Sequence, residues 1–222
     1  TGKSCVERNL LRAYLLAPEP VPCQPFGMLP QCYPSDHSDG SYIANWALWL
    51  AFELKEYPAR SKDEELVRLF RGKVMRLFAF LRRFENEDGL LEDVGGWVFV
   101  EWSRANDFTE GVNYPSNMLY SAALQAAREL YGENALLEKG KKVAERVREQ
   151  SFNGTFFADN AVRREGVLVR TENTSETCQY YAFFFGIADQ KSLPALFERM
   201  FEGSRALLQE KHPSLWPSNA FI

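Results

Sequence analysis

Uncharged and charged helical segments alternate along this sequence, and the alternation restricts the fold more than any other feature. Three stretches carry almost no charge: 41–52, 115–127 and 175–187, where Glu176 is the one charged residue. Each is followed by a segment with apolar residues three or four positions apart and charged residues on the other side, at 61–81, 134–147 and 194–208. Because a helix without a polar face is a buried helix, we predict three hairpins, each of one buried and one exposed helix.

Such hairpins cannot bury their apolar faces alone, so they must stack as an open solenoid or close into a ring. A capping box, Ser61 followed by Glu64, is expected to open the first exposed helix. One more helix is predicted near Cys5–Leu16, and short β-prone pieces at 98–100 and 167–169 interrupt the connections. We favour an all-α fold, an (α/α) toroid of helical hairpins, with residues 1–222 forming part of one barrel domain. Since the chain begins at Thr1, we expect a fragment, roughly half to two-thirds of a ring of six hairpins.

Composition excludes several functions. The 222 residues are 45% hydrophobic and 25% charged, as in ordinary folded proteins. A net charge of −4 without a lysine or arginine stripe argues against nucleic-acid binding. The sequence shows neither a membrane-spanning run nor a signal peptide, so no membrane role is predicted, and the compartment stays open between cytoplasmic and periplasmic or secreted. Four scattered cysteines and two histidines suggest no zinc site or disulfide framework, and we expect no metal or other cofactor.

The densest chemistry lies in the long connection from Trp97 to Asp107. Aromatic planes stack on the apolar faces of sugar rings, and carboxylates and amides bind sugar hydroxyls, so Trp102 beside Glu101 suits a carbohydrate pocket. The other interpretation is that Trp97 and Trp102 are core anchors and that Glu101 pairs with Arg104. Long ordered loops are usually functional, and loops entering one end of a ring of inner helices would converge on one mouth.

Weaker candidates lie in the first connection and the helix after it. Asp36 and His37, with Asp39, could line a site, although the same residues are typical of a turn. Trp46 lies about two helical turns from the end of this loop and could reach the mouth, although such residues are more often core. In half a ring, inner-helix surface around Trp46, Ala122 and Phe184 would be exposed, which favours self-association.

Several motifs, in this order, make the chain resemble the catalytic domain of bacterial α-L-rhamnosidase-like glycoside hydrolases. They are GMLP at 27–30, CYPSDH at 32–37, NEDGLLE at 86–92, WVFVEWS at 97–103, NYPSNMLY at 113–120 and CQYYAFFFG at 178–186. The resemblance extends over essentially the whole chain. It implies a ring of six helical hairpins of the six-hairpin glycosidase type, and a carbohydrate partner, a terminal α-L-rhamnoside.

The resemblance also implies a mechanism, inverting hydrolysis by one carboxylic acid and one carboxylate that activates water. In this family the general acid lies in a Cys-Pro-x-Arg-x-Glu motif expected before residue 1, and the general base lies near a Trp-Glu pair expected after residue 222. We therefore expect this chain alone to be inactive and to supply part of the sugar-binding wall. Trp46 and Trp102 match the family's aromatic positions, and Glu101 is the acidic partner of Trp102 and the catalytic candidate within the chain. Asp36, His37 and Asp107 are substrate-binding candidates by loop position.

Two other functions stay open from the sequence. The same toroid could hydrolyse a different glycoside, or the chain could be a non-catalytic helical-repeat protein that binds carbohydrate or serves as a scaffold.

Overall fold

The computed structural model describes residues 4–20, 22–34, 40–202 and 205–218, so the candidates Asp36 and His37 lie outside the described residues. The described part is mostly helical, as predicted, and none of its helices is long and apolar enough to cross a membrane. The helices are α1 (Cys5–Leu16), α2 (Ala44–Ser61), α3 (Glu64–Leu81), α4 (Tyr114–Tyr131), α5 (Asn134–Ser151), α6 (Glu176–Phe184), α7 (Pro194–Phe197) and α8 (Arg205–Lys211), with a π-helical turn at Glu198–Glu202 and 3₁₀ turns at Arg82–Phe84 and Arg104–Asp107.

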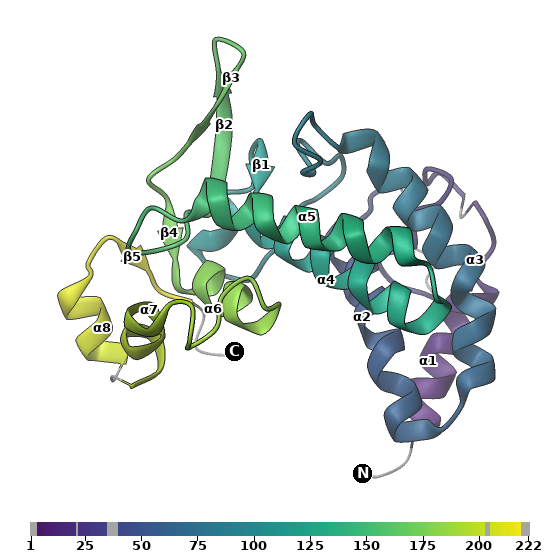
Figure 1. The fold of residues 1–222 in the computed structure, drawn as a ribbon. Helices are drawn as coiled ribbons and strands as arrows, with labels where there is room; N and C mark the ends of the chain where they lie inside the picture. The colour runs from purple at the N-terminus through teal and green to yellow at the C-terminus, as the bar shows by residue number, and fades with distance from the viewer. Residues whose placement is uncertain (1–3, 21, 35–39, 203–204, 219–222) are drawn as a thin grey trace.

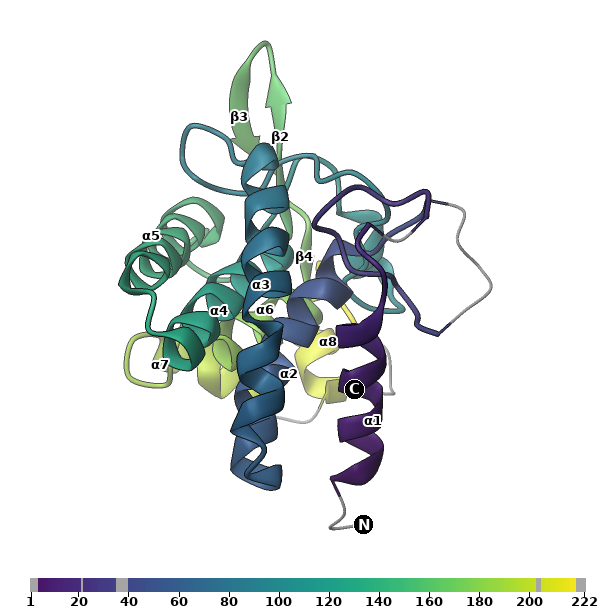
Figure 2. The ribbon, with the colours of Figure 1, turned by 90° about the vertical axis from the view of Figure 1, so that its right-hand side faces the viewer.

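Helix α4 occupies the centre of the molecule and packs against α2, α3, α5 and α6 (Figure 1). Its side chains are buried almost without interruption from Tyr114 to Ala127, which confirms the prediction from the uncharged segment. Helix α5 lies on one side of it and buries a single stripe. Figure 2 shows α1 and α3 side by side on another side of the molecule. The predicted alternation of a buried and an exposed helix is therefore confirmed for α4 and α5, whereas α2 has a partly exposed side that includes Trp46 and is no more buried than α3.

The close contact between α4 and α5 depends on Gly140. A Cβ atom at this position would lie 2.8 Å from Cγ of Gln125 and 3.0 Å from the carbonyl oxygen of Ser121. The Ser121 hydroxyl donates a hydrogen bond of 2.8 Å to the carbonyl of Gly140. The missing side chain thus lets the two helices approach until a side chain of one bonds the backbone of the other.

Short strands tie the connections together at one end of the helices. Strand β1 (Val112–Asn113) pairs antiparallel with β2 (Asn160–Arg164), and β2 pairs with β3 (Val167–Arg170) in a hairpin that projects from the helical body (Figure 1). Strand β4 (Thr174–Ser175) pairs in parallel with β5 (Leu215–Trp216). Since β1 leads into α4 and β4 leads into α6, the second and third of the long connections meet near the N-terminal ends of these helices.

Some local predictions were wrong. The first buried helix begins at Ala44 rather than 41 and extends to Ser61, so Ser61 ends α2 and does not cap α3. The cap is Asp63, whose carboxylate accepts a hydrogen bond of 3.2 Å from the backbone N–H of Leu66, because the chain turns between the helices in two residues. The segment 194–208 is not one helix but α7, a π-helical turn and the start of α8.

Two further predictions need correction. Residues 98–100 form no strand, whereas the strand predicted at 167–169 is β3. Ala122 is buried rather than exposed, because α4 is covered by helices on several sides. Trp46 and Phe184 are exposed, as predicted.

Candidate functional site

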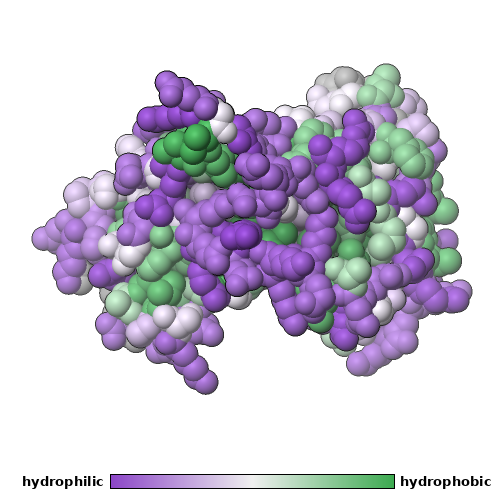
Figure 3. Space-filling model, turned by 45° about the horizontal axis from the view of Figure 1, so that its top comes forward, coloured by the Kyte–Doolittle hydropathy of each residue, from purple (hydrophilic) through white to green (hydrophobic). Residues whose placement is uncertain are grey.

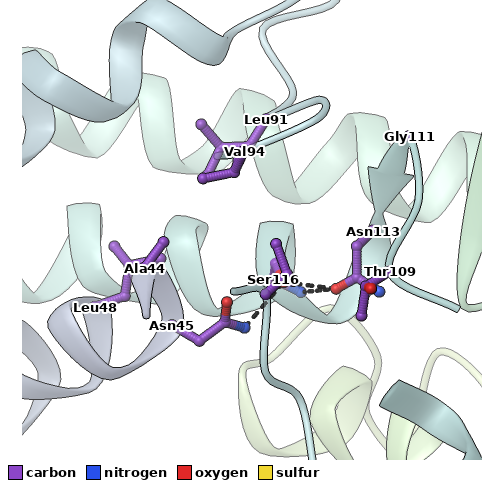
Figure 4. A pocket seen from close by; sticks show the side chains of 10 residues that line it. Ala44, Asn45, Leu48, Leu91, Val94, Thr109, Gly111, Asn113 and Ser116 are labelled. Atoms are coloured by element: carbon purple, nitrogen blue, oxygen red, sulfur yellow. Dashed lines mark hydrogen bonds between the residues drawn. The ribbon is translucent and has the colours of Figure 1, made fainter. Parts of the chain in front are cut away.

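A buried polar network fixes the connection that carries the aromatic motif. Asn45 of α2 donates a hydrogen bond of 2.9 Å to the Ser116 hydroxyl, which donates one of 2.6 Å to Oδ1 of Asn113 (Figure 4). Asn113 also accepts from the backbone N–H of Ser116 at 3.0 Å and thereby caps α4. Figure 4 shows the small pocket beside this network, whose volume of about 10 Å³ has room for about one water molecule. The network is therefore structural and is not the ligand site.

Aromatic rings gather on the segment 97–102, which precedes Asn113 in the chain. The ring centroids of Phe99 and Trp102 are 4.8 Å apart, those of Trp97 and Phe99 are 5.1 Å apart, and Trp46 of α2 meets Phe99 at 6.1 Å. Trp102 is 69% exposed and Trp97 is 44% exposed. The interpretation of these two residues as core anchors is therefore wrong. We call Trp46, Trp97, Phe99 and Trp102 the tryptophan cluster.

Glu101 points the opposite way from its neighbour Trp102. It is only 5% exposed, and its Oε2 accepts a hydrogen bond of 3.4 Å from the Thr177 hydroxyl in the first turn of α6. The sequence suggests an ion pair between Glu101 and Arg104. Arg104 instead pairs with Asp107 at 2.9 Å, three residues further along in the same 3₁₀ turn. Arg104 and Asp107 are both exposed at the surface, whereas Glu101 faces the interior.

A pocket of about 290 Å³ lies next to Glu101, between α2 and α6. Thr177 belongs both to its wall and to the hydrogen bond with Glu101. The Tyr181 hydroxyl donates a hydrogen bond of 3.1 Å to the carbonyl of Val100 and so holds α6 against the connection. Burial raises the pKa of Tyr181 to about 12, so it is a neutral donor. The wall is mainly aromatic and apolar and consists of Trp49, Val100, Thr177, Tyr180, Tyr181 and Phe184.

The candidates from the sequence are therefore partly brought together. Trp46 and Trp102 share the tryptophan cluster, and Glu101 reaches the pocket wall through Thr177. Asp107 lies at the surface of the same connection. Sequence reasoning missed the pocket residues of α6, although Thr177 and Tyr181 stand four positions apart on a helix that the sequence does predict and whose one charged residue is Glu176.

Trp216 is the other missed residue. It belongs to β5, and its Cα is paired with that of Ser175, the residue that caps α6. The guanidinium carbon of Arg104 lies 4.1 Å from the centroid of the Trp216 ring. An aromatic residue between two prolines, which are Pro213 and Pro217, was the available signal in the sequence.

The face shown in Figure 3 carries apolar residues in separate patches divided by hydrophilic ones. Among the described residues, no group of three or more histidine, cysteine, aspartate or glutamate side chains is placed to hold a metal ion. The site that this part of the chain offers is thus aromatic, with hydroxyl and carboxylate groups beside it.

The fold and the site together define a class of protein, one with packed helical hairpins and an aromatic pocket between two of the helices, α2 and α6. No protein-family model matches the sequence, and no curated protein matches it significantly. Solved structures do match. The crystal structure of a GH78 family rhamnosidase of Bacillus sp. GL1 gives a TM-score of 0.67 at 19% identity, over 86% of this chain and 20% of that chain.

A rhamnosidase from Klebsiella oxytoca, solved with rhamnose bound, gives a TM-score of 0.64 at 13% identity, over 87% of this chain and 36% of that chain. This chain therefore has a rhamnosidase-like fold and spans well under half the length of these two solved chains.

Proposed function

We propose that this chain forms part of the sugar-binding wall of a glycoside hydrolase that cleaves terminal α-L-rhamnosides with inversion. The observation that supports this function best is the pocket of about 290 Å³ between α2 and α6. Its volume lies at the lower end of the range of small-ligand sites, about 300–1,000 Å³, which suits one sugar ring. It occurs in a chain whose fold matches that of rhamnosidases.

The character of the wall favours a deoxy sugar. Rhamnose carries a methyl group where an ordinary hexose carries a hydroxymethyl group. Beside Trp49, Val100 and Phe184, a methyl group would gain apolar contacts. A hydroxyl at the same place would lose its hydrogen bonds to water, at a cost of about 1–3 kcal/mol. This favours a rhamnoside over a glycoside of another specificity on the same fold.

The roles of the side chains follow from their exposure. We propose that Trp46 and Trp102 stack on the ligand, since both rings are exposed and both contact Phe99, close in sequence to Val100 of the pocket wall. Glu101 remains the catalytic candidate within the chain, and its contact with Thr177 gives it a route to the pocket. Asp107, at the surface of the same connection, is the weaker binding candidate, together with Asp36 and His37. The main acid and base are expected outside residues 1–222, and the helices are proposed to belong to a larger (α/α) toroid.

Binding of L-rhamnose and L-mannose tests the proposal, because these sugars differ only by the hydroxyl on C6. We expect saturation-transfer NMR or calorimetry to show that this chain prefers L-rhamnose by roughly tenfold or more. Trp102→Ala should weaken binding, and Phe26→Ala, which removes another exposed aromatic ring outside the cluster, should not. Absence of binding to either sugar would contradict the proposed function, and equal binding would contradict the rhamnoside specificity.

A second measurement separates an enzyme from a carbohydrate-binding module. We expect no hydrolysis of aryl α-L-rhamnosides by this chain alone, and hydrolysis when the chain is part of the full-length protein. A full-length protein that binds rhamnose without hydrolysing any aryl glycoside of a panel would favour the non-catalytic alternative.

A further inference from the structure

Trp216 has the geometry of a platform for a flat ring. The guanidinium group of Arg104 lies over its ring at 4.1 Å, and Asp107 holds that guanidinium in place with an ion pair of 2.9 Å. The Trp216 residue is nevertheless 37% exposed. A guanidinium stacked on an indole is attractive and restricts the rotation of the ring. The indole is thus held by protein on one side and accessible from another.

The backbone around Trp216 is fixed on both sides. Leu215 is completely buried, and β5 pairs in parallel with β4. The Thr174 hydroxyl donates a hydrogen bond of 3.3 Å to the carbonyl of Ser214. After the tryptophan, the backbone N–H and the hydroxyl of Ser218 both donate to Glu176 at 3.0 Å. Because this segment is well anchored, the Trp216 ring would lose little conformational entropy when a ligand stacks on it.

Two separate routes connect this platform to the proposed sugar pocket. Through the strands, Trp216 is paired with Ser175, two residues before Thr177 of the pocket wall. Through the connection, Arg104 lies three residues after Glu101, which accepts the hydrogen bond from Thr177. Trp216 is therefore linked to the pocket wall through β4 and the first turn of α6, whereas Trp46 enters the tryptophan cluster from α2.

We propose that Trp216, backed by Arg104 and Asp107, binds the second ring of the ligand, the sugar or flat aglycone to which the terminal rhamnose is attached. This proposal rests on the proposed function and extends it, because it names the residue that would set the preference for the group next to the scissile bond. The pocket itself has room for a single ring, so a second ring has to lie at the rim. The exposed side of Trp216 supplies the apolar surface that the face of a pyranose or an aromatic aglycone requires.

The test compares methyl α-L-rhamnoside, which has one ring, with a disaccharide that ends in α-L-rhamnose. Binding of both to this chain is measured by calorimetry. We expect Trp216→Ala to weaken disaccharide binding about five- to tenfold, in line with the loss of one stacking contact, and to leave methyl rhamnoside binding unchanged. Trp216→Phe keeps a stacking face and should retain most of the disaccharide affinity. Arg104→Met removes the backing charge and should give an intermediate loss, with a change in tryptophan fluorescence.

The outcomes separate the two proposals. If the wild-type chain binds neither ligand, the proposed function fails. If the wild-type chain binds methyl rhamnoside, two results would overturn the assignment of the second ring to Trp216. One is that Trp216→Ala leaves the disaccharide affinity unchanged. The other is that Trp216→Ala weakens the binding of both ligands equally and Trp216→Phe does not restore it. The circular dichroism spectrum of each variant shows whether it is folded, and an unfolded Trp216→Ala is replaced in the comparison by Arg104→Met.

Discussion

Replacing Asp159 by asparagine should remove a loss of folding stability that the wild type shows as pH rises. Asp159 precedes β2, and its side chain is completely buried. Its Oδ1 accepts a hydrogen bond of 2.6 Å from the Ser175 hydroxyl, which in turn accepts one from the backbone N–H of Cys178 at 3.1 Å and caps α6. Its Oδ2 is buried and has no hydrogen-bond partner within the described part of the chain. Burial raises the pKa of Asp159 from its ordinary value of 3.8 to about 7, against the opposing effect of the bond from Ser175.

The sign of the effect follows from the protons that each state binds. The folded state keeps this proton up to about pH 7, whereas the unfolded chain releases it near 3.8. Between these values the folded state binds more protons, so its stability falls as pH rises through this window and then stays low. A pKa difference of one corresponds to about 1.4 kcal/mol, so the full loss by pH 7 is about 4 kcal/mol. Asparagine keeps the acceptor for Ser175 and carries no charge, so the variant should lose this dependence.

The assay is urea unfolding at pH 5 and pH 8, followed by circular dichroism, for the wild type, Asp159→Asn and Asp107→Asn. Other titrating groups affect all three proteins, so the quantity of interest is the difference between each variant and the wild type. We expect Asp159→Asn to gain about 2–3 kcal/mol relative to the wild type between pH 5 and pH 8. The exposed control Asp107→Asn should change little. Parallel pH profiles of the wild type and Asp159→Asn would refute the reasoning.

Three further predictions concern packing within the fold and self-association of the chain. Asn117→Ala should destabilise the fold by about 2–4 kcal/mol in thermal or urea unfolding, because the Asn117 amide accepts from the N–H of Leu91 at 2.7 Å and donates to its carbonyl at 2.9 Å, and both groups would be left buried without partners. Gly140→Ala should lower the free energy of unfolding by about 1–3 kcal/mol, because the added methyl group would make close contacts with α4. The control Gly72→Ala should be neutral or stabilising, because the nearest neighbour of Gly72 is the flexible side chain of an arginine. Equal effects of the two substitutions would contradict the packing argument. Phe184, 62% exposed, should drive self-association of the chain, so light scattering should show a smaller species for Phe184→Ser, and a monodisperse wild-type monomer would contradict this.

The helices could be predicted because their signals are local. An uncharged run from 115 to 127 has only one stable place, the centre of the molecule, and α4 occupies it. The periodic apolar residues of α3 and α5 likewise leave one face for the core. The last outer segment failed because its apolar residues have helical spacing although its backbone breaks into α7, a π-helical turn and α8. Spacing does not report where a helix is interrupted.

The site was only partly predictable because it depends on distant pairings. The motif around Glu101 and Trp102 is dense enough to stand out in the sequence. The contacts that hold this motif in place cannot be recognised in the sequence. The amides of Asn113 and Asn117 bond backbone groups whose positions are determined by the fold alone. Trp216 is brought next to the start of α6 by the pairing of β4 with β5, two strands of two residues each, which carry almost no sequence signal.

The opposite directions of Glu101 and Trp102 show why an acidic residue followed by tryptophan is a useful pair at such a mouth. The backbone turns tightly at Trp102, where the N–H of Ser103 donates a hydrogen bond of 2.8 Å to the carbonyl of Glu101, so one residue step separates a buried carboxylate from an exposed indole. Glu101 thereby contacts Thr177 of the pocket wall, and Trp102 joins the exposed rings of the tryptophan cluster. Amides hold the connection around this pair, since Oδ1 of Asn106 accepts from the N–H of Val100 at 2.9 Å and the Asn113 amide donates to the carbonyl of Phe108 at 2.9 Å. Polar side chains that are proposed to bind no ligand thus help to position those that are.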